Sequence, residues 1–436
     1  MISVLAHRDF RLLWAGHLVS VTGDMLLFVA LPFHVYSLTG SPLATGLTFV
    51  AETLPMIVLG PVAGVFVDRW DRRLTMIGAD VVRAAALTPL FLVRSASDVW
   101  VVYLVAVVLA SASQFFSPAR QSLLPTLVPA DRLVDANSVT SVAESVTKLV
   151  GPPVGGALFV AAGLDVAVLV DGLSFLVSLA VLVMIRAQPV REDVALRRPR
   201  VVDDLVDGLR YIVGRRALVA LFAALVVTGL GSGILHALLI PFASITLQGT
   251  PRDFGFLITA EAVGGLLGGL LVGRVARRMR PFTMISCGLT LTGIAFAATA
   301  NAPSVGWAMV GLAAVGVPAV IAVVGITSLF QAQVADRYRG RVFASIGTCE
   351  ALMRIVGIGV ASALAGSIGI VPLLDAAGVL LVLAALAPLV IGTREADDAM
   401  APTDGDLVEA AADRVGVVPA ALSREPTPPT DEPQTA

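Results

Sequence analysis

The sequence predicts an all-α membrane protein with twelve transmembrane helices in two pseudo-symmetric six-helix bundles. Three observations predict this fold class. Of the 436 residues, 57% are hydrophobic and 14% are charged, whereas soluble domains carry about 25% charged residues. Apolar runs of about 20 residues, enough to cross a bilayer, recur along nearly the whole chain. Charged residues also recur at matching positions in the two halves. The composition excludes an ordinary soluble enzyme, a disordered protein and a basic nucleic-acid-binding domain.

The predicted spans follow one another closely along the chain. They are expected near residues 12–37, 42–66, 74–93, 98–118, 137–161, 164–185, 217–246, 253–273, 281–300, 303–330, 341–369 and 371–392. The first run has no small-residue cleavage site and the next run follows at once. We therefore expect a membrane helix there rather than a cleavable signal.

The arginine distribution predicts the orientation, because basic residues collect in cytoplasmic segments. With the N-terminus inside, 23 arginines fall in cytoplasmic segments before the tail, and only Arg94 and Arg252 fall in outside loops. We therefore expect both termini in the cytoplasm. The preference for arginine over lysine and the many Ala and Val residues are typical of a GC-rich bacterial genome, which favours a bacterial plasma (inner) membrane.

The chain is expected to divide into four parts. Residues 1–186 form an N-terminal six-helix bundle, and residues 217–393 form a C-terminal six-helix bundle. Between them, 187–216 is a cytoplasmic linker in which charged and apolar residues near Asp207 and Arg210 favour a short amphipathic helix. The tail, 394–436, is acidic and rich in Pro, Thr and Ala, so we expect it to be disordered.

An internal repeat relates the two halves at an offset of about 205–209 residues. The matching charged pairs are Glu52/Glu261, Arg69/Arg274, Arg72/Arg277, Arg73/Arg278, Glu144/Glu350, Lys148/Arg354 and Asp171/Asp375. Charges inside a membrane are rare, so their alignment argues against chance. A duplicated bundle of this kind holds its substrate near the middle of the membrane, between the halves.

No catalytic, nucleotide-binding or metal-binding motif competes with transport. The chain has neither a phosphate-binding loop nor a helical H-E-x-x-H pattern, and its two cysteines, Cys287 and Cys349, are too few for a structural zinc site. We expect no enzyme activity, no metal and no cofactor, with a proton gradient as the energy source. The expected partners are the lipid bilayer and a small-molecule substrate, with no nucleic acid and no obligate protein partner.

Residues 64–73 read GVFVDRWDRR. They resemble the signature G-x-x-x-D-R-x-G-R-R between helices two and three of the major facilitator superfamily. The matching residues are Gly64, Asp68, Arg69, Arg72 and Arg73. Asp71 stands where the pattern has glycine, and the second-half copy has Gly273 in place of the aspartate. The resemblance implies a major facilitator fold and a cytoplasmic gate that locks the halves together when the cavity opens outward.

Two further stretches resemble exporters of that superfamily. Residues 115–137, which include FFSPARQSLLPTLVP, look like the branch of the enterobactin exporter and the macrolide efflux proteins. The stretch Gly151, Pro152, Gly155 and Gly156 resembles the antiporter signature in helix five, with Thr147 at its upstream glycine. The prolines are expected to kink that helix, either as a static bend or as a hinge.

These resemblances imply secondary export of a bulky amphipathic small molecule, such as a drug, a macrolide or a siderophore-like compound, by alternating access with proton antiport. Two alternatives stay open. One is an importer or uniporter of a small solute with the same fold. The other is a transport-inactive membrane sensor or scaffold.

Helical spacing predicts ion pairs inside the spans. The pairs are Glu144 with Lys148, Glu350 with Arg354, and Asp80 with Arg83. Asp171 and Asp375 are expected to be charges at helix ends near the outer surface.

Asp24, Glu52 and Glu261 are then the candidates for proton coupling or substrate contact. Asp24 lies about 18 Å along the first helix, and it shares one helical face with His17 and Ser20. A hydrogen-bonded structural acid is the alternative role for Asp24. Gln114 in the fourth span is a candidate for hydrogen bonding to substrate. Many antiporters of the superfamily have an arginine in the middle of this span, and none lies between Val99 and Ala119.

Overall fold

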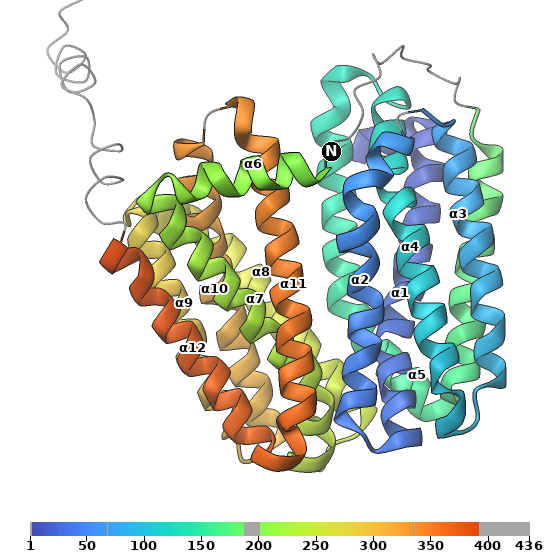
Figure 1. Ribbon diagram of the computed structural model, residues 1–436. Helices are drawn as coiled ribbons and strands as arrows, with labels where there is room; N and C mark the ends of the chain where they lie inside the picture. Colours follow the sequence, from blue (N-terminus) through green and yellow to red (C-terminus); the bar gives the residue numbers. More distant parts are fainter. Residues whose placement is uncertain (1, 68, 187–200, 335, 392–436) are drawn as a thin grey trace, which may run out of the picture. The chain divides into compact units, whose positions relative to one another are not determined.

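The computed structural model describes residues 2–67, 69–186, 201–334 and 336–391 (Figure 1). Ten helices in these ranges are long and apolar enough to cross a membrane, and Ile370–Leu386 adds a shorter apolar stretch. One of the ten, α5, has helical segments on both sides of a break. The described helices are therefore consistent with twelve spans, and the described ranges contain no β-strand. The expected acidic tail, 394–436, lies outside the described residues.

The first half contains five long helices, α1 (Arg8–Thr39), α2 (Pro42–Val67), α3 (Arg72–Leu87), α4 (Val99–Leu123) and α5 (Leu133–Met184). Local signals fix several ends. Gly40 ends α1 in the left-handed conformation, and its N–H donates to the Tyr36 carbonyl at 2.8 Å. Asp71 caps the start of α3 by accepting a hydrogen bond from the Leu74 N–H at 2.8 Å.

Helix α5 is two helical segments joined at Gly163, whose φ of 74° and ψ of −172° are not helical. Glycine adopts this conformation without the steric penalty of a side chain. Helical dihedral angles continue through Pro152 and Pro153, so the dihedral break lies at Gly163 and not at the prolines. The predicted boundary between the fifth and sixth spans agrees with this position.

The second half contains α6 (Val201–Val213), α7 (Arg216–Pro241), α8 (Pro251–Ala276), α9 (Pro281–Ala300), α10 (Val305–Gln333), α11 (Asp336–Ile368) and α12 (Ile370–Ile391). Helix α6 lies across the ends of the helices beside it (Figure 1) and occupies part of the expected linker. The remaining linker residues 187–200 lie outside the described part. Thr250 and Asp253 form a capping box at the start of α8.

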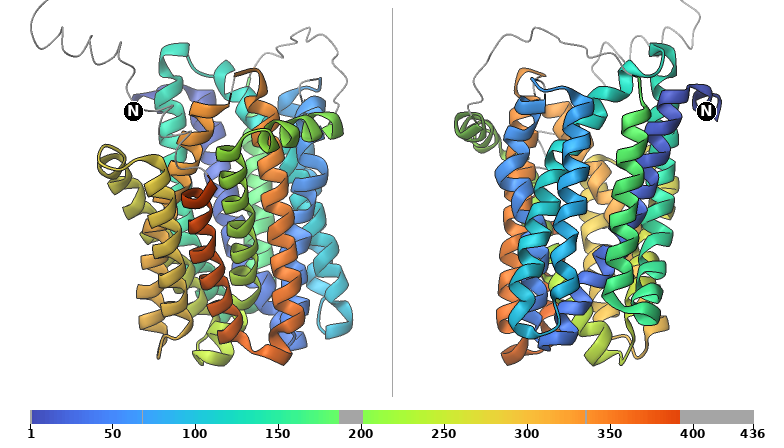
Figure 2. Two further views of the ribbon diagram at one scale, coloured as in Figure 1. Left: turned by 60° about the vertical axis from the view of Figure 1, so that its left-hand side comes forward. Right: turned by 90° about the vertical axis from the view of Figure 1, so that its right-hand side faces the viewer.

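Packing within each half uses small residues and close helix contacts, as expected in lipid. In the first half α1 packs mainly along α5, and α4 packs between α2 and α3 (Figure 2). Gly16 and Gly23 on α1 lie against the second segment of α5. In the second half α10 packs on α8 and α9, and α11 packs on α7. Large apolar side chains such as Trp100 and Leu270 are exposed, which suits a surface in contact with lipid.

The two halves contact each other through α2 with α11 and through α5 with α8. These contacts lie near the first turns of α2 and α8, at the end that carries the α1–α2 and α7–α8 connections (Figure 1). At the same end Arg94 donates two hydrogen bonds to Asp165, at 3.0 and 2.9 Å. These bonds raise the pKa of Arg94 above its usual value.

Candidate functional site

A buried ion pair lies in the interior of the first half. The Nη1 atom of Arg83 donates to Oδ1 of Asp80 at 3.3 Å, as their i, i+3 spacing predicts. Both side chains are almost fully buried. The Arg83 guanidinium also lies 4.4 Å from the ring centre of Phe116 and 5.4 Å from that of Phe175. These two rings, from α4 and α5, hold the cation in place.

Two more aspartates interact with the same arginine. Asp24 on α1 and Asp171 on α5 each interact electrostatically with Arg83 and with one another. Asp171 is fully buried, and the Ser174 hydroxyl donates to it. The expectation that Asp171 is a charge at a helix end is wrong. Its helical segment begins just after Gly163, so Asp171 lies two turns inside and faces the interior of the half.

This group, Asp24, Asp80, Arg83 and Asp171, is called the Arg83 cluster below. It contains three carboxyl groups and one guanidinium. The Oδ2 atoms of Asp80 and Asp171 have no hydrogen-bond partner among the described residues. Unpaired buried carboxylates are costly. The Arg83 cluster therefore offers places where protons can be bound and released.

A second polar contact joins three helices of the first half. The Nε2 atom of His17 lies 2.8 Å from Oε1 of Glu144, and Arg120 donates its Nη2 hydrogen to the same oxygen at 3.2 Å. The predicted pair of Glu144 with Lys148 is not formed among the described residues. Glu144 contacts His17 on α1 and Arg120 on α4, and Lys148, one turn further along α5, is exposed.

Arg120 is a residue that the sequence analysis did not single out for the site. It lies in the last turn of α4, and its side chain is 14% exposed. It comes directly after the stretch from Val99 to Ala119, which contains no arginine. Its partner Glu144 follows 24 residues later, so no helical spacing could reveal the pair.

Glu52 and Gln114 lie on two helices of the first half, α2 and α4, that pack on each other. Glu52 follows Phe49 by three residues, so the two share a face of α2. The Phe49 ring lies 6.1 Å from Phe28 on α1 and 5.9 Å from His236 on α7. Glu52 thus lies on the side of α2 that meets the second half. Gln114 on α4 lies beside Gly60 of α2.

The second half contains a cavity of about 460 Å³, lined by residues of α7 to α12. Glu261 and Glu350 both contribute to its lining. Arg354 donates to Glu350 at 3.2 Å, as their i, i+4 spacing predicts. Glu261 makes no hydrogen bond or ion pair with any described residue.

In the signature segment, two arginines bind helix ends within the first half. Arg72 donates to the Ser122 carbonyl at 3.0 Å, near the end of α4. Arg73 donates to the Leu182 and Val183 carbonyls at 2.7 and 2.6 Å, near the end of α5. Both arginines donate to carbonyls in the last turns of these helices, where intrahelical donors run out.

The other signature residues have different environments. Arg69 is exposed, and Gly64 lies in α2. Asp68, the residue expected to form the gate, lies outside the described residues. Asp71, which stands where the signature has glycine, caps α3.

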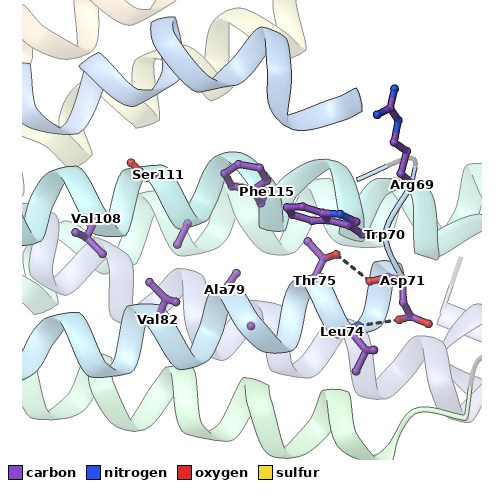
Figure 3. Close-up of a pocket in the computed structure, with 12 residues that line it drawn as sticks. Arg69, Trp70, Asp71, Leu74, Thr75, Ala79, Val82, Val108, Ser111 and Phe115 are labelled. Atoms are coloured by element: carbon purple, nitrogen blue, oxygen red, sulfur yellow. Dashed lines mark hydrogen bonds between the residues drawn. The ribbon is translucent and has the colours of Figure 1, made fainter. Parts of the chain in front are cut away.

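A groove of about 800 Å³ runs along α3 and α4 beside this segment (Figure 3). Trp70 stacks on Phe115 at its mouth, with ring centres 6.0 Å apart. Val82, Val108 and Arg69 are among the residues that line it (Figure 3). Leu74 and Val82 are exposed. The groove therefore opens on the surface of the first-half bundle and not between the halves.

The helix-five stretch lies where three helices meet. Gly151 and Gly155 leave room for Met25 and Leu26 of α1. Gly156 lies against the backbone of Pro251 and Arg252, at the start of α8.

Residues of α8 that the sequence analysis did not single out complete this contact between the halves. Gly255 lies against the backbone of Pro152. The Thr259 hydroxyl donates to the Leu149 carbonyl at 2.9 Å.

The helix bundles, the buried charges in their interiors and the glycine contacts between them define a membrane transporter. A family model described as Major Facilitator Superfamily matches residues 13–358 and 221–419. The chain belongs to the major facilitator superfamily, and it is a multi-pass membrane protein of the kind found in bacteria.

Two known proteins of similar sequence are named as efflux proteins. Macrolide efflux protein A of Streptococcus pyogenes is 27% identical over 401 residues, covering 89% of this chain and 97% of that protein. Multidrug efflux pump Tap of Mycolicibacterium fortuitum is 30% identical over 366 residues, covering 81% and 88%. These relatives indicate an efflux transporter of the macrolide efflux branch.

A solved structure shares the fold. The crystal structure of a bacterial homologue of the iron transporter ferroportin in an inward-facing state has a TM-score of 0.71 and 17% identity. The match covers 89% of this chain and 99% of that one.

Proposed function

We propose that this protein is a secondary exporter that moves a bulky amphipathic small molecule out of the cell by alternating access, driven by proton entry. The observation that carries the proposal is the Arg83 cluster in the interior of the first half, in which Asp80 bonds the Arg83 guanidinium and Asp24 and Asp171 interact with it electrostatically. A proton that joins or leaves such a cluster changes its charge, and so changes the forces between α1, α3 and α5.

A continuous chain of contacts links the cluster to the boundary between the halves. Asp24 is followed directly by Met25 and Leu26, which pack on Gly151 and Gly155 of α5. The adjacent Gly156 lies against the start of α8. A shift of α1 at Asp24 would therefore move the surface on which the second half rests. This is the coupling that we propose between protonation and the rocking of the halves.

The arginine distribution supports an orientation with both termini in the cytoplasm. In that orientation, the contacts between the halves lie on the outer side of the membrane, and the cytoplasmic side is where substrate would enter. A bacterial plasma membrane is the proposed location. The names of the efflux relatives favour drug-like or macrolide-like substrates.

Two rival functions predict different results. An importer or uniporter would raise the cellular content of its substrate. A sensor or scaffold would depend on the tail, so deleting residues 394–436 would abolish its function while leaving an exporter active.

The proposal is tested by measuring accumulation of fluorescent and antibiotic compounds in a pump-deficient bacterium that expresses the protein. We expect lower accumulation of at least one compound, and we expect a protonophore to abolish the effect. Asp24→Asn should lose export at a normal protein level. Asp131→Asn, which changes an exposed carboxylate, is the matched control. Unchanged accumulation of every compound, or export that resists the protonophore, would contradict the proposal.

A further inference from the structure

The cavity inside the second half has the size and walls of a small-molecule site. Its volume of about 460 Å³ falls in the range of ligand pockets, roughly 300–1,000 Å³. Leu289, Phe296 and Phe330 form part of its apolar wall and are buried. Val323 also contributes to the lining and is 52% exposed, so the cavity is open at this edge.

Three of the four hydroxyl groups that line the cavity have their hydrogens engaged. Those of Thr228, Thr292 and Thr327 each donate to a carbonyl of their own helix four residues earlier, at 2.8 to 3.0 Å. The fourth, that of Ser232, lies 3.4 Å from Nδ1 of His236. A hydroxyl oxygen keeps acceptor lone pairs after its hydrogen is engaged. The three threonine hydroxyls can therefore accept hydrogen bonds from a ligand in the cavity but have no hydrogen left to donate.

Only one of the two carboxyl groups in the cavity has a positively charged partner. Glu350 accepts from Arg354, whereas Glu261 has no ion pair or hydrogen bond among the described residues. The first half places Arg83 among its buried acids. At the offset of 205 residues that relates Arg72 and Arg73 to Arg277 and Arg278, the counterpart of Arg83 is Gly288. The second half therefore lacks that cation.

We propose that this cavity binds the protonated amine of an amphipathic molecule, with Glu261 as its counter-ion. An ammonium group carries a positive charge and N–H donors but no acceptor, so it complements a lone carboxylate and acceptor oxygens. The apolar wall receives the rest of the molecule, and aromatic rings such as Phe296 attract a cation. The inference rests on the proposed export function and names the class of substrate, a cationic amphiphile.

The test is a binding measurement on the full chain in lipid nanodiscs, with empty nanodiscs as background. The probe is dansylcadaverine, a primary amine on an apolar fluorophore, and its neutral counterpart is N-acetyl dansylcadaverine. We expect Glu261→Gln to weaken binding of the amine by about tenfold or more and to leave the weaker binding of the neutral compound unchanged. Asp375→Asn is the control, because its carboxylate bonds Asn301 outside the cavity.

If Glu261→Gln does not fold, a second variant, Gly347→Phe, can test the cavity. Gly347 lines the cavity, and a Cβ atom added there meets nothing within 4 Å. Gly347→Phe should fill the cavity and weaken binding of both probes. The inference is overturned if the wild-type protein binds neither probe. It is equally overturned if folded Glu261→Gln binds the amine as the wild type does, or loses both probes equally. Because no transport is measured, a failed export assay in cells would not be mistaken for failure of this site.

Discussion

The Nε2 atom of His17 on α1 lies 2.8 Å from Oε1 of Glu144 on α5. Arg120 on α4 reaches the same oxygen at 3.2 Å, so one carboxylate joins three helices. The continuation of α5 then contacts α8 through Gly156. The Glu144 contact therefore holds α1, α4 and α5 together, and α5 is the helix that meets α8 of the second half.

Glu144→Gln is expected to lower the melting temperature of the purified protein. The variant leaves Arg120 without its anionic partner, at a cost of about 1–3 kcal/mol. Ser145→Ala is the control, since that hydroxyl bonds only a carbonyl of its own helix. Equal melting temperatures for the two variants would show that the carboxylate does not hold the helices together.

Replacing Arg83 should destabilise the protein more strongly. Arg83→Met leaves three buried carboxyl groups without a cation, and breaking a buried pair costs about 3–5 kcal/mol. The double variant Arg83→Met with Asp80→Asn should recover part of the loss, because the group left unpaired is then neutral. Melting temperatures of the two single variants and the double variant give the interaction energy. Purely additive losses would mean that the two residues do not act as a pair.

A side chain at Gly255 should prevent closure between α5 and α8. There is no room for one beside the Pro152 backbone, so Gly255→Leu should abolish export while the protein still folds. Gly269→Leu on the same helix is the control, because it meets nothing within 4 Å. Labelling of Thr259→Cys by an impermeant maleimide, in a background with Cys287 and Cys349 replaced, should increase in Gly255→Leu alone. Equal labelling in both backgrounds would contradict this account of the contact.

Two arginines of the signature, Arg73 and Arg69, should differ in how much they contribute to stability. Arg73→Gln removes bonds to two carbonyls at the end of α5 and should cost about 1–3 kcal/mol of stability. Arg69→Gln changes an exposed side chain and should leave the melting temperature within a degree or two of wild type. If Arg69→Gln melts as early as Arg73→Gln, the assignment of the helix-end role to Arg73 is wrong.

The sequence alone predicted features that depend on local spacing. The spans follow from the length of apolar runs, and the pairs Asp80–Arg83 and Glu350–Arg354 follow from the geometry of one helix. Glu144 was assigned to Lys148 by the same rule. Its actual partners, His17 and Arg120, come from other helices, and only tertiary packing decides between the candidates.

Other features gave no signal in the sequence. Asp171 was misjudged because its depth depends on how the segment after Gly163 rotates against α1. The second-half cavity is formed by residues from six helices, and no single residue or local spacing in the sequence predicts it. The role of Arg120 was not foreseen, because the preference for arginine at the cytoplasmic side describes loops on average and does not tell where one side chain points.

The most direct test of the central claim uses the purified protein in sealed liposomes with a pH gradient imposed across the membrane. A fluorescent substrate identified in cells is supplied outside, and its uptake into liposomes is followed together with internal pH. The account predicts uptake that needs the gradient, proton movement in the opposite direction, and loss of both in Asp24→Asn. Uptake of equal extent without a gradient, or with no accompanying proton movement, would contradict it.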